Sequence, residues 1–334
     1  VGSKGVEGTV RAQATITKIG STGRVGIGDA TTTLLNLSAG DLSLADGDPV
    51  STWPDTSAYE NDGTQGTGGA QPTFRTNVLN GQPVVRFDGS GDELEVANDA
   101  SLNEGGEPYL NRAKTIVFQT GSDVSNRQVL FEEGGGTRGF NLYIEDGDLH
   151  VAGWNNQDAP ADPLVDDGND NLAGSEDPTT PWENESDGDS FVFVEKSVSS
   201  NTAYVATLAY DYAKGTIELV LNGADRGSAT GAGRQYGHGG EIRIGRDGSS
   251  FDESGSTGAG AEFGGDLAAL KFTDASLNTT QRTLLHNALT AKYDITLDTG
   301  NGATDVYAGH TSGNGDYDLG VFGVGREADR KSVV

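Results

Sequence analysis

Short runs of β-forming residues, separated by turns, constrain this chain more than any other feature. In these runs Val, Ile, Phe, Tyr and Thr alternate with polar residues, a period typical of strands that are buried on one face. Gly, Asp and Asn fill the intervals, where they favour tight turns. The even spacing favours two stacked antiparallel sheets over alternating strands and helices. We therefore predict an all-β fold, a two-sheet antiparallel β-sandwich of the jelly-roll type, with strands at 83–89, 92–97, 114–120, 127–133, 139–146, 148–154, 191–198, 203–212, 216–223, 241–246 and 266–274.

A single segment, 278–293, has the period of an amphipathic helix. Asn278 or Thr279 can cap its first turn, because short polar side chains accept hydrogen bonds from the free N–H groups there. We predict one short helix in the C-terminal part of the chain, packed through an apolar stripe. The stripe consists of Leu284, Leu285, Ala288, Leu289 and Ala291.

Composition divides the chain of 334 residues into three parts. The predicted strands and helix fall within 33–297, which we predict to be one sandwich domain. Residues 1–32 and 298–334 are rich in Gly and too poor in apolar residues for a core of their own. We interpret 1–32 as an extended segment that can add as a strand to a neighbouring copy, through Val10, Ala12, Ala14 and Ile16. The chain does not begin with Met, so we expect it to be processed or to be a segment of a longer protein.

The charge is strongly negative, because 50 acidic and 22 basic residues give a formal net charge of -28. Such a field repels phosphate backbones and anionic lipids, so nucleic-acid binding is not expected. No apolar run approaches the ~20 residues of a spanning helix, and membrane insertion is not expected. The acidity suits a secreted, extracellular or cell-surface protein, and adaptation to high salt is a compatible explanation. The absence of Cys excludes disulfides and thiolate sites.

A long polar segment, 155–190, interrupts the strand pattern and is expected to be a surface loop. Two Trp residues flank it. Exposed aromatic rings stack on sugar faces, while nearby amides and carboxylates bond the hydroxyls. The candidate glycan-binding residues are therefore Trp154, Asn155, Asn156, Asp158 and Trp182.

Two acidic loops are candidate calcium sites, because hard cations prefer carboxylate and carbonyl oxygens. The alternative is that both are solvated turns, in which Asp and Asn bond the local backbone. Neither loop contains the full EF-hand pattern. The candidate ligands are Asp55, Asn61 and Asp62 in one loop and Asp166, Asp167 and Asp170 in the other.

Catalytic patterns are not found in the sequence. Glu132 and Glu133 lie in a predicted strand, where adjacent side chains point to opposite faces and cannot act as one pair. The four His residues are scattered, without zinc-site spacing. We predict that the protein is not an enzyme. Three Asn-X-Ser/Thr sequences are candidate glycosylation sites: Asn36, Asn184 and Asn278.

Several runs follow one another in a characteristic order: DGDPVSTWPDTSAYENDGTQ (46–65), NGQPVVRFDGSGDELEV (80–96), QVLFEEGGGTRGFNLYIEDGDLHVAGWN (128–155), TLAYDYAKGTIELVLNG (207–223) and GGEIRIGR (239–246). In this order they resemble the concanavalin A-like, laminin-G-like jelly-roll family of secreted and cell-surface proteins. The resemblance covers about 33–297 and implies the same sandwich. It places Trp53 at the end of an early strand, packed under the next loop, with sugar stacking as the alternative.

Members of this family bind glycans, mediate adhesion or act as structural spacers, so the fold alone does not choose among these roles. We predict an extracellular structural or adhesive protein that assembles with copies of itself into a filament, matrix or layer through its terminal segments. The alternative is a carbohydrate-binding module of a larger secreted protein. The expected partners are copies of the chain or surface glycans, and calcium is the one cofactor expected.

Overall fold

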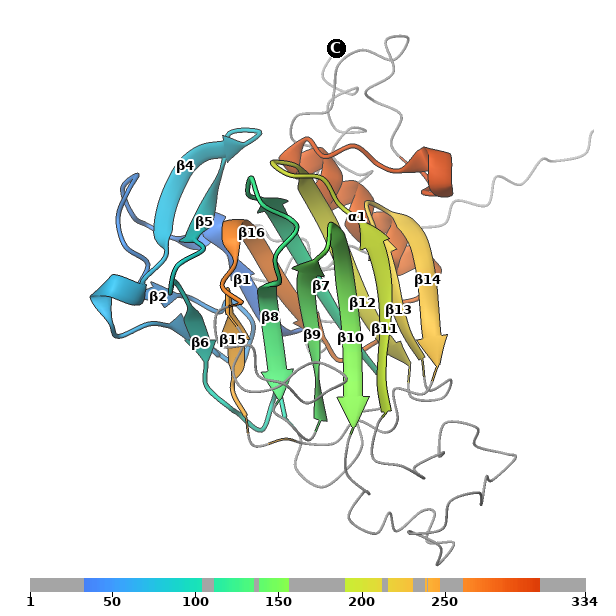
Figure 1. The fold of residues 1–334 in the computed structure, drawn as a ribbon, viewed down its shortest axis with the longest axis horizontal. Helices are drawn as coiled ribbons and strands as arrows, with labels where there is room; N and C mark the ends of the chain where they lie inside the picture. The colour runs from blue at the N-terminus through green and yellow to red at the C-terminus, as the bar shows by residue number, and fades with distance from the viewer. Residues whose placement is uncertain are drawn as a thin grey trace, which may run out of the picture.

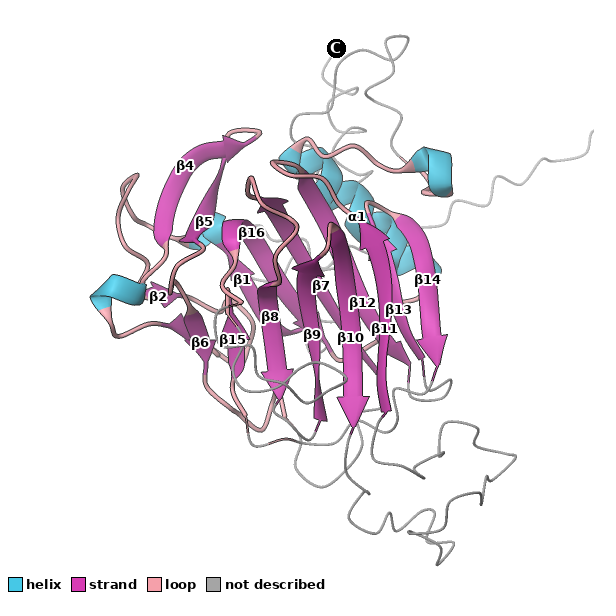
Figure 2. Ribbon diagram, in the orientation of Figure 1, coloured by secondary structure: helices cyan, strands magenta, loops and turns pink. Residues whose placement is uncertain are grey.

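The computed structural model describes residues 33–103, 111–134, 138–155, 190–211, 216–230, 238, 240–246 and 261–306. These residues form two antiparallel sheets that pack face to face (Figure 1). Figure 2 shows that strands make up most of the regular structure, with one α-helix, α1 (Thr279–Tyr293), beside them. The prediction of an all-β, two-sheet sandwich with a helix in its C-terminal part is confirmed.

The first sheet has the strand order β14-β13-β12-β7-β16-β5-β4, and β1 also pairs with β16. The second sheet has the order β11-β10-β9-β8-β15-β6-β3-β2. The strands of the first sheet are β1 (Thr33–Ser38), β4 (Thr73–Leu79), β5 (Gln82–Asp88), β7 (Asn111–Thr120), β12 (Ala203–Asp211), β13 (Thr216–Leu221), β14 (Ala224–Thr230) and β16 (Gly264–Thr273). Those of the second are β2 (Thr52–Trp53), β3 (Gly63–Thr64), β6 (Leu94–Val96), β8 (Gln128–Gly134), β9 (Arg138–Glu145), β10 (Asp148–Asn155), β11 (Ser190–Ser197) and β15 (Ile242–Ile244).

Every predicted strand is present, and the structure adds β1, β2, β3, β4 and β14. These five carry weak local signals. The sequence of β14, ADRGSAT, has no apolar alternation, and it is a strand because it pairs with β13. In β4 the backbone at Asn77 has a φ of 55°, which interrupts the strand register. Short and irregular strands of this kind depend on a neighbour that sequence periodicity does not show.

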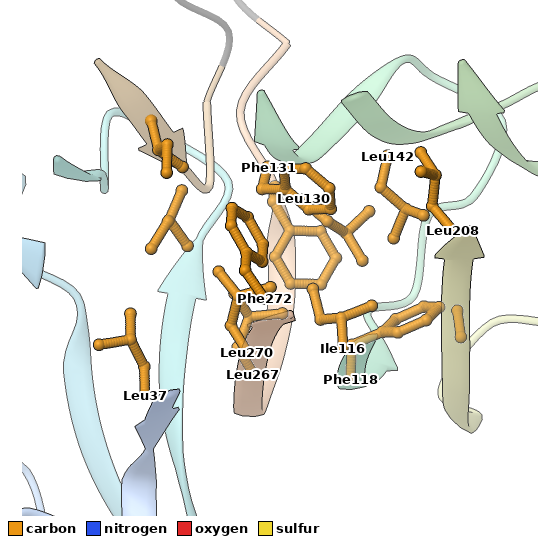
Figure 3. Packing of buried hydrophobic residues seen from close by; sticks show 14 of the residues in the cluster. Leu37, Ile116, Phe118, Leu130, Phe131, Leu142, Leu208, Leu267, Leu270 and Phe272 are labelled. Carbon is orange, nitrogen blue, oxygen red and sulfur yellow. The ribbon is translucent and has the colours of Figure 1, made fainter. Parts of the chain in front are cut away.

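The main core lies between the two sheets and is built from alternate residues of the strands. Figure 3 shows Phe131 of β8 close to Phe272 of β16, and their ring centroids are 5.4 Å apart. Trp53 has no exposed surface and belongs to this core, so its predicted packing role is confirmed. Removing this apolar surface from water is the dominant favourable contribution to folding.

Helix α1 covers the outer face of the first sheet, where Leu285 packs against Ala113 and Leu277. Asn278 caps the helix by accepting a hydrogen bond from the Gln281 N–H, as predicted, and the Gln281 side chain completes a capping box. The predicted apolar stripe is wrong at Leu284, which is 41% exposed. The buried residues of the helix are Leu285, His286, Asn287, Thr290 and Tyr293.

Candidate functional site

A polar groove of about 760 Å³ lies where several connections of the sandwich meet. It is formed by the turn after β5, the connection between β7 and β8, the end of β9 and the start of β16. A volume of this size is typical of small-ligand sites. The groove is lined by Asp88, Gly89, Ser122, Asp123, Asn126, Arg127, Gln128, Glu145, Ala261, Glu262 and Gly264.

Arg127 and Glu145 form a fork-to-fork ion pair in the wall of the groove. Arg127 Nε donates to Glu145 Oε1 at 3.1 Å, and Nη2 donates to Oε2 at 2.9 Å. The guanidinium also lies 5.9 Å from the centroid of the Tyr143 ring, which is stacked on the His150 ring at 4.6 Å. A bidentate pair placed on an aromatic face has a defined orientation. Arg127 therefore has a defined orientation in the wall of the groove.

Asp123 is held by the loop that follows β7. Its Oδ1 accepts hydrogen bonds from the Ser125 hydroxyl at 2.7 Å and the Ser125 N–H at 2.8 Å, and its other oxygen accepts from the Asn126 amide. These hydrogen bonds, first those from the Ser125 and Asn126 side chains, lower the pKa of Asp123 to about 2. The carboxylate is thus charged and oriented at neutral pH.

Gln128 connects the two sides of the groove. Its Nε2 donates to the Asp123 carbonyl at 2.9 Å, and its Oε1 accepts from the Gly264 N–H at 3.0 Å. Close by, a Cβ on Gly121 would lie 2.2 Å from the Gly264 carbonyl oxygen, so only glycine permits this approach of the two backbones. The groove is therefore a built feature in which separate segments are fixed to one another.

The lining residues carry four carboxylates against one guanidinium, so the groove has a negative potential. Like charge disfavours an anionic ligand at this place. Amide, hydroxyl, carboxylate and guanidinium groups together offer both donors and acceptors. The arrangement suits a neutral ligand with many hydroxyl groups.

The predicted glycan-binding residues lie mostly outside the described part of the chain. Trp154 and Asn155 are the last residues of β10, where they pair with Gly139 and Arg138 of β9. Asn156, Asp158 and Trp182 are outside the described residues, so this set stays a prediction. Sequence reasoning missed the groove itself. The one local signal was Asp123-x-Ser125, a pattern in which Asp bonds the backbone two residues later.

The first candidate calcium loop is organised by hydrogen bonds around Asp55, which is 6% exposed. Its Oδ1 accepts from the N–H groups of Asn36 and Ser57, and its Oδ2 accepts from the Ser57 hydroxyl and the Asn61 N–H. Asp62 in turn accepts from the Asp55 N–H. The Asp55 carboxylate accepts the hydrogen bond of the Asn36 N–H, which a carbonyl of a neighbouring strand would otherwise accept. The loop thus covers the edge of β1.

Within the described ranges, no group of three or more His, Asp and Glu side chains is arranged to hold a metal ion. The second candidate loop, with Asp166, Asp167 and Asp170, lies outside these ranges. Calcium therefore stays a prediction for this protein.

Two of the candidate glycosylation sites have structural contacts. The Asn36 side chain donates to the Thr56 hydroxyl at 2.7 Å, and Asn278 caps α1. Asn184 lies outside the described residues, as does the predicted assembly strand with Val10, Ala12, Ala14 and Ile16. Glu132 and Glu133 lie next to each other in β8, and both are 2% exposed.

The fold is similar to that of several toxin binding domains of known structure. The receptor binding domain of botulinum neurotoxin D matches with a TM-score of 0.52 and 13% identity, over 79% of this chain and 54% of that chain. The binding domain of Paraclostridial Mosquitocidal Protein 1 matches with a TM-score of 0.51 and 12% identity, over 78% of this chain and 53% of that one. The botulinum neurotoxin serotype D ligand binding domain in complex with N-acetylneuraminic acid matches with a TM-score of 0.50 and 12% identity, over 77% and 51%.

The likeness is one of fold. This chain spans about half the length of these solved structures. No family model matches the sequence, and no curated protein matches it. The resemblance seen in the sequence is thus supported at the level of a two-sheet antiparallel β-sandwich. Among the described residues, no helix is both long and apolar enough to cross a membrane.

Proposed function

We propose that this protein is a carbohydrate-binding module that binds neutral glycans in the polar groove. The observation that carries the proposal is the preorganised set of Asp123, Arg127 and Gln128, each fixed by contacts within the protein. A ligand then meets the Asp123 carboxylate in an orientation that is already fixed, in a groove whose two sides are held together by the buried Gln128, which reduces the entropic cost of binding. The fold is one in which a structural neighbour binds a sugar.

The charge of the groove defines the class of glycan. Carboxylates accept hydrogen bonds from sugar hydroxyls, so the oriented Asp123 carboxylate suits a ligand with many hydroxyl groups. Sialic acids carry a carboxylate of their own, which the four acidic side chains of the groove repel. We therefore expect neutral hexose or amino-sugar glycans to bind and sialylated glycans to be rejected.

A setting outside the cell follows from the same proposal, because glycan ligands of this kind are displayed on surfaces and in matrices. The acidic composition, with a formal net charge of -28, accords with it. Self-assembly through 1–32 is compatible with glycan binding, since it would use a different part of the chain.

The test is a glycan array probed with the full chain, followed by titration of each hit. We expect Asp123→Ala and Gln128→Ala to weaken binding at least tenfold. Leu284→Gln, an exposed substitution on α1, is the matched control and should bind like the parent protein. No binding to any glycan, or equal binding by Asp123→Ala and the parent, would overturn the proposal.

A further inference from the structure

A buried ion pair joins the two sheets of the sandwich. Lys114 extends from β7 of the first sheet and Glu133 from β8 of the second, and Lys114 Nζ lies 2.6 Å from Glu133 Oε2. The two side chains are 1% and 2% exposed. Burial of two charges costs several kcal/mol per ion, and the attraction between them offsets that cost only in part.

Aromatic rings enclose the lysine nitrogen. Nζ lies 4.6 Å from the centroid of the Phe140 ring and 4.6 Å from that of Phe272. These rings exclude water from the pair. Burial lowers the pKa of Lys114, although its attraction to Glu133 acts in the opposite direction. The pKa of Glu133 is lowered to about 2, because the charge of Lys114 and a hydrogen bond with His238 outweigh the effect of burial. The pair is therefore ionic at rest, and Lys114 becomes nucleophilic only when it passes a proton to the carboxylate.

His238 is the third member of this cluster. Its Nε2 lies 3.3 Å from Glu133 Oε1, and its Nδ1 lies 3.0 Å from the Gly240 carbonyl oxygen. Both neighbours are acceptors, so a hydrogen on Nε2 faces the Glu133 carboxylate. Asn103 fixes the backbone of His238. Its Oδ1 accepts from the His238 backbone N–H, and its Nδ2 donates to the His238 carbonyl oxygen. A fixed N–H donor thus faces the second oxygen of the carboxyl group.

We propose that Lys114 and Glu133 condense to an isopeptide bond that cross-links the two sheets, with His238 as the catalytic residue. Lys114 Nζ lies 2.6 Å from Glu133 Oε2, and the carboxyl carbon Cδ is one bond beyond that oxygen. Nζ is therefore near the distance of ~3–3.5 Å from the carbon at which nucleophilic attack begins. The product replaces a buried ion pair by a neutral amide, which removes the electrostatic cost of burial. No cofactor or oxidant is required.

The atoms balance as follows. The Lys114 ammonium gives one proton to Glu133 Oε2, and the neutral Nζ attacks Cδ to form the C–N bond. Charge that develops on Oε1 is stabilised by the Nε2–H group of His238. The nitrogen then gives a second proton to Oε2, the Cδ–Oε2 bond breaks, and Oε2 leaves as water. Oε1 remains as the amide oxygen, and His238 keeps its proton.

Mass spectrometry of the denatured full chain tests the proposal. We expect an intact mass lower than the sequence mass by one water, and a proteolytic peptide that contains both Lys114 and Glu133. Lys114→Met should have its full sequence mass. Glu133→Gln should lose ammonia and reach the same cross-linked mass as the parent protein. Lys271→Arg, a change at another lysine of the first sheet, is the control and should still be cross-linked.

His238→Gln separates catalysis from packing, because it keeps a polar side chain but loses the imidazole N–H that faces Glu133 Oε1. We expect the cross-linked fraction of this variant to fall at least tenfold while its circular dichroism spectrum matches that of the parent. If the folded parent protein retains its full sequence mass after prolonged incubation at neutral pH, no isopeptide bond forms and the proposal fails.

Discussion

His286 of α1 and Thr207 of β12 are joined by a buried hydrogen bond, with Nε2 2.9 Å from the hydroxyl oxygen. The Gly223 N–H donates to Nδ1 at 2.9 Å, so the ring is neutral and carries its proton on Nε2. Thr207 continues the network to Thr115 of β7 at 2.7 Å. The helix is thus fastened to the outer face of the first sheet through a fully buried imidazole.

This contact makes the fold sensitive to acid. Burial, with a smaller contribution from the Arg282 charge, lowers the pKa of His286 to about 3 from its ordinary value of 6.5. Below pH 6.5 the unfolded chain binds a proton that the folded chain does not, so the free energy of unfolding falls by about 1.4 kcal/mol per pH unit down to about pH 3. Urea denaturation from pH 8 to pH 3 measures this slope. His286→Leu should be less stable at pH 8 and should show a shallower slope, and an unchanged slope would contradict the prediction.

Asp92 has the opposite effect on stability. Its pKa is raised to about 6, chiefly by burial and to a smaller extent by the negative charge of Asp88. A hydrogen bond from the Asp88 N–H acts in the opposite direction and lowers the pKa. A carboxyl group whose pKa is raised on folding stabilises the protein below about pH 4 and loses this contribution as the pH rises through 6. Asp92→Asn keeps an acceptor for the Asp88 N–H. We expect it to raise the melting temperature at pH 8 and to leave it unchanged at pH 3.5. Equal effects at both pH values would show that the charge is not responsible.

Asp55 should stabilise the fold through its hydrogen bonds. Asp55→Ala leaves four donors without their acceptor, including the Asn36 N–H at the edge of β1. We expect a loss of roughly 1–3 kcal/mol in the free energy of unfolding, equal with calcium and with chelator. If calcium binds in this loop, chelator should instead lower the melting temperature of the parent and not that of Asp55→Ala. If Asp55→Ala still responds to chelator, calcium binds elsewhere, and Asp166, Asp167 and Asp170 are the remaining candidate ligands.

Removal of residues 1–32 tests self-assembly. If this segment adds as a strand to a neighbouring copy, the parent chain should form filaments or layers and the truncated chain should not. Electron microscopy and light scattering at matched concentrations distinguish the two. The described domain begins with β1 at Thr33, so the truncation leaves every described strand intact. Assemblies that persist after the truncation would contradict a donated strand.

Local patterns in the sequence were sufficient for the longer strands, the helix and its cap. The alternation in 139–146 and the capping residues at Asn278 are properties of a few consecutive positions, and such positions fix backbone geometry without a partner. The five weak strands were missed because they have no such local pattern. β14 becomes a strand only through its hydrogen bonds to β13.

The two proposed sites depend on contacts between segments that lie far apart along the chain. The groove joins the turn after β5 to the start of β16, and Gln128 connects positions separated by 136 residues. The sequence by itself determined that Glu132 and Glu133 point to opposite faces of a strand. Only the tertiary structure decided that Glu133 meets Lys114 across the core, because the stacking of two sheets is set by packing over their whole faces and not by any local period.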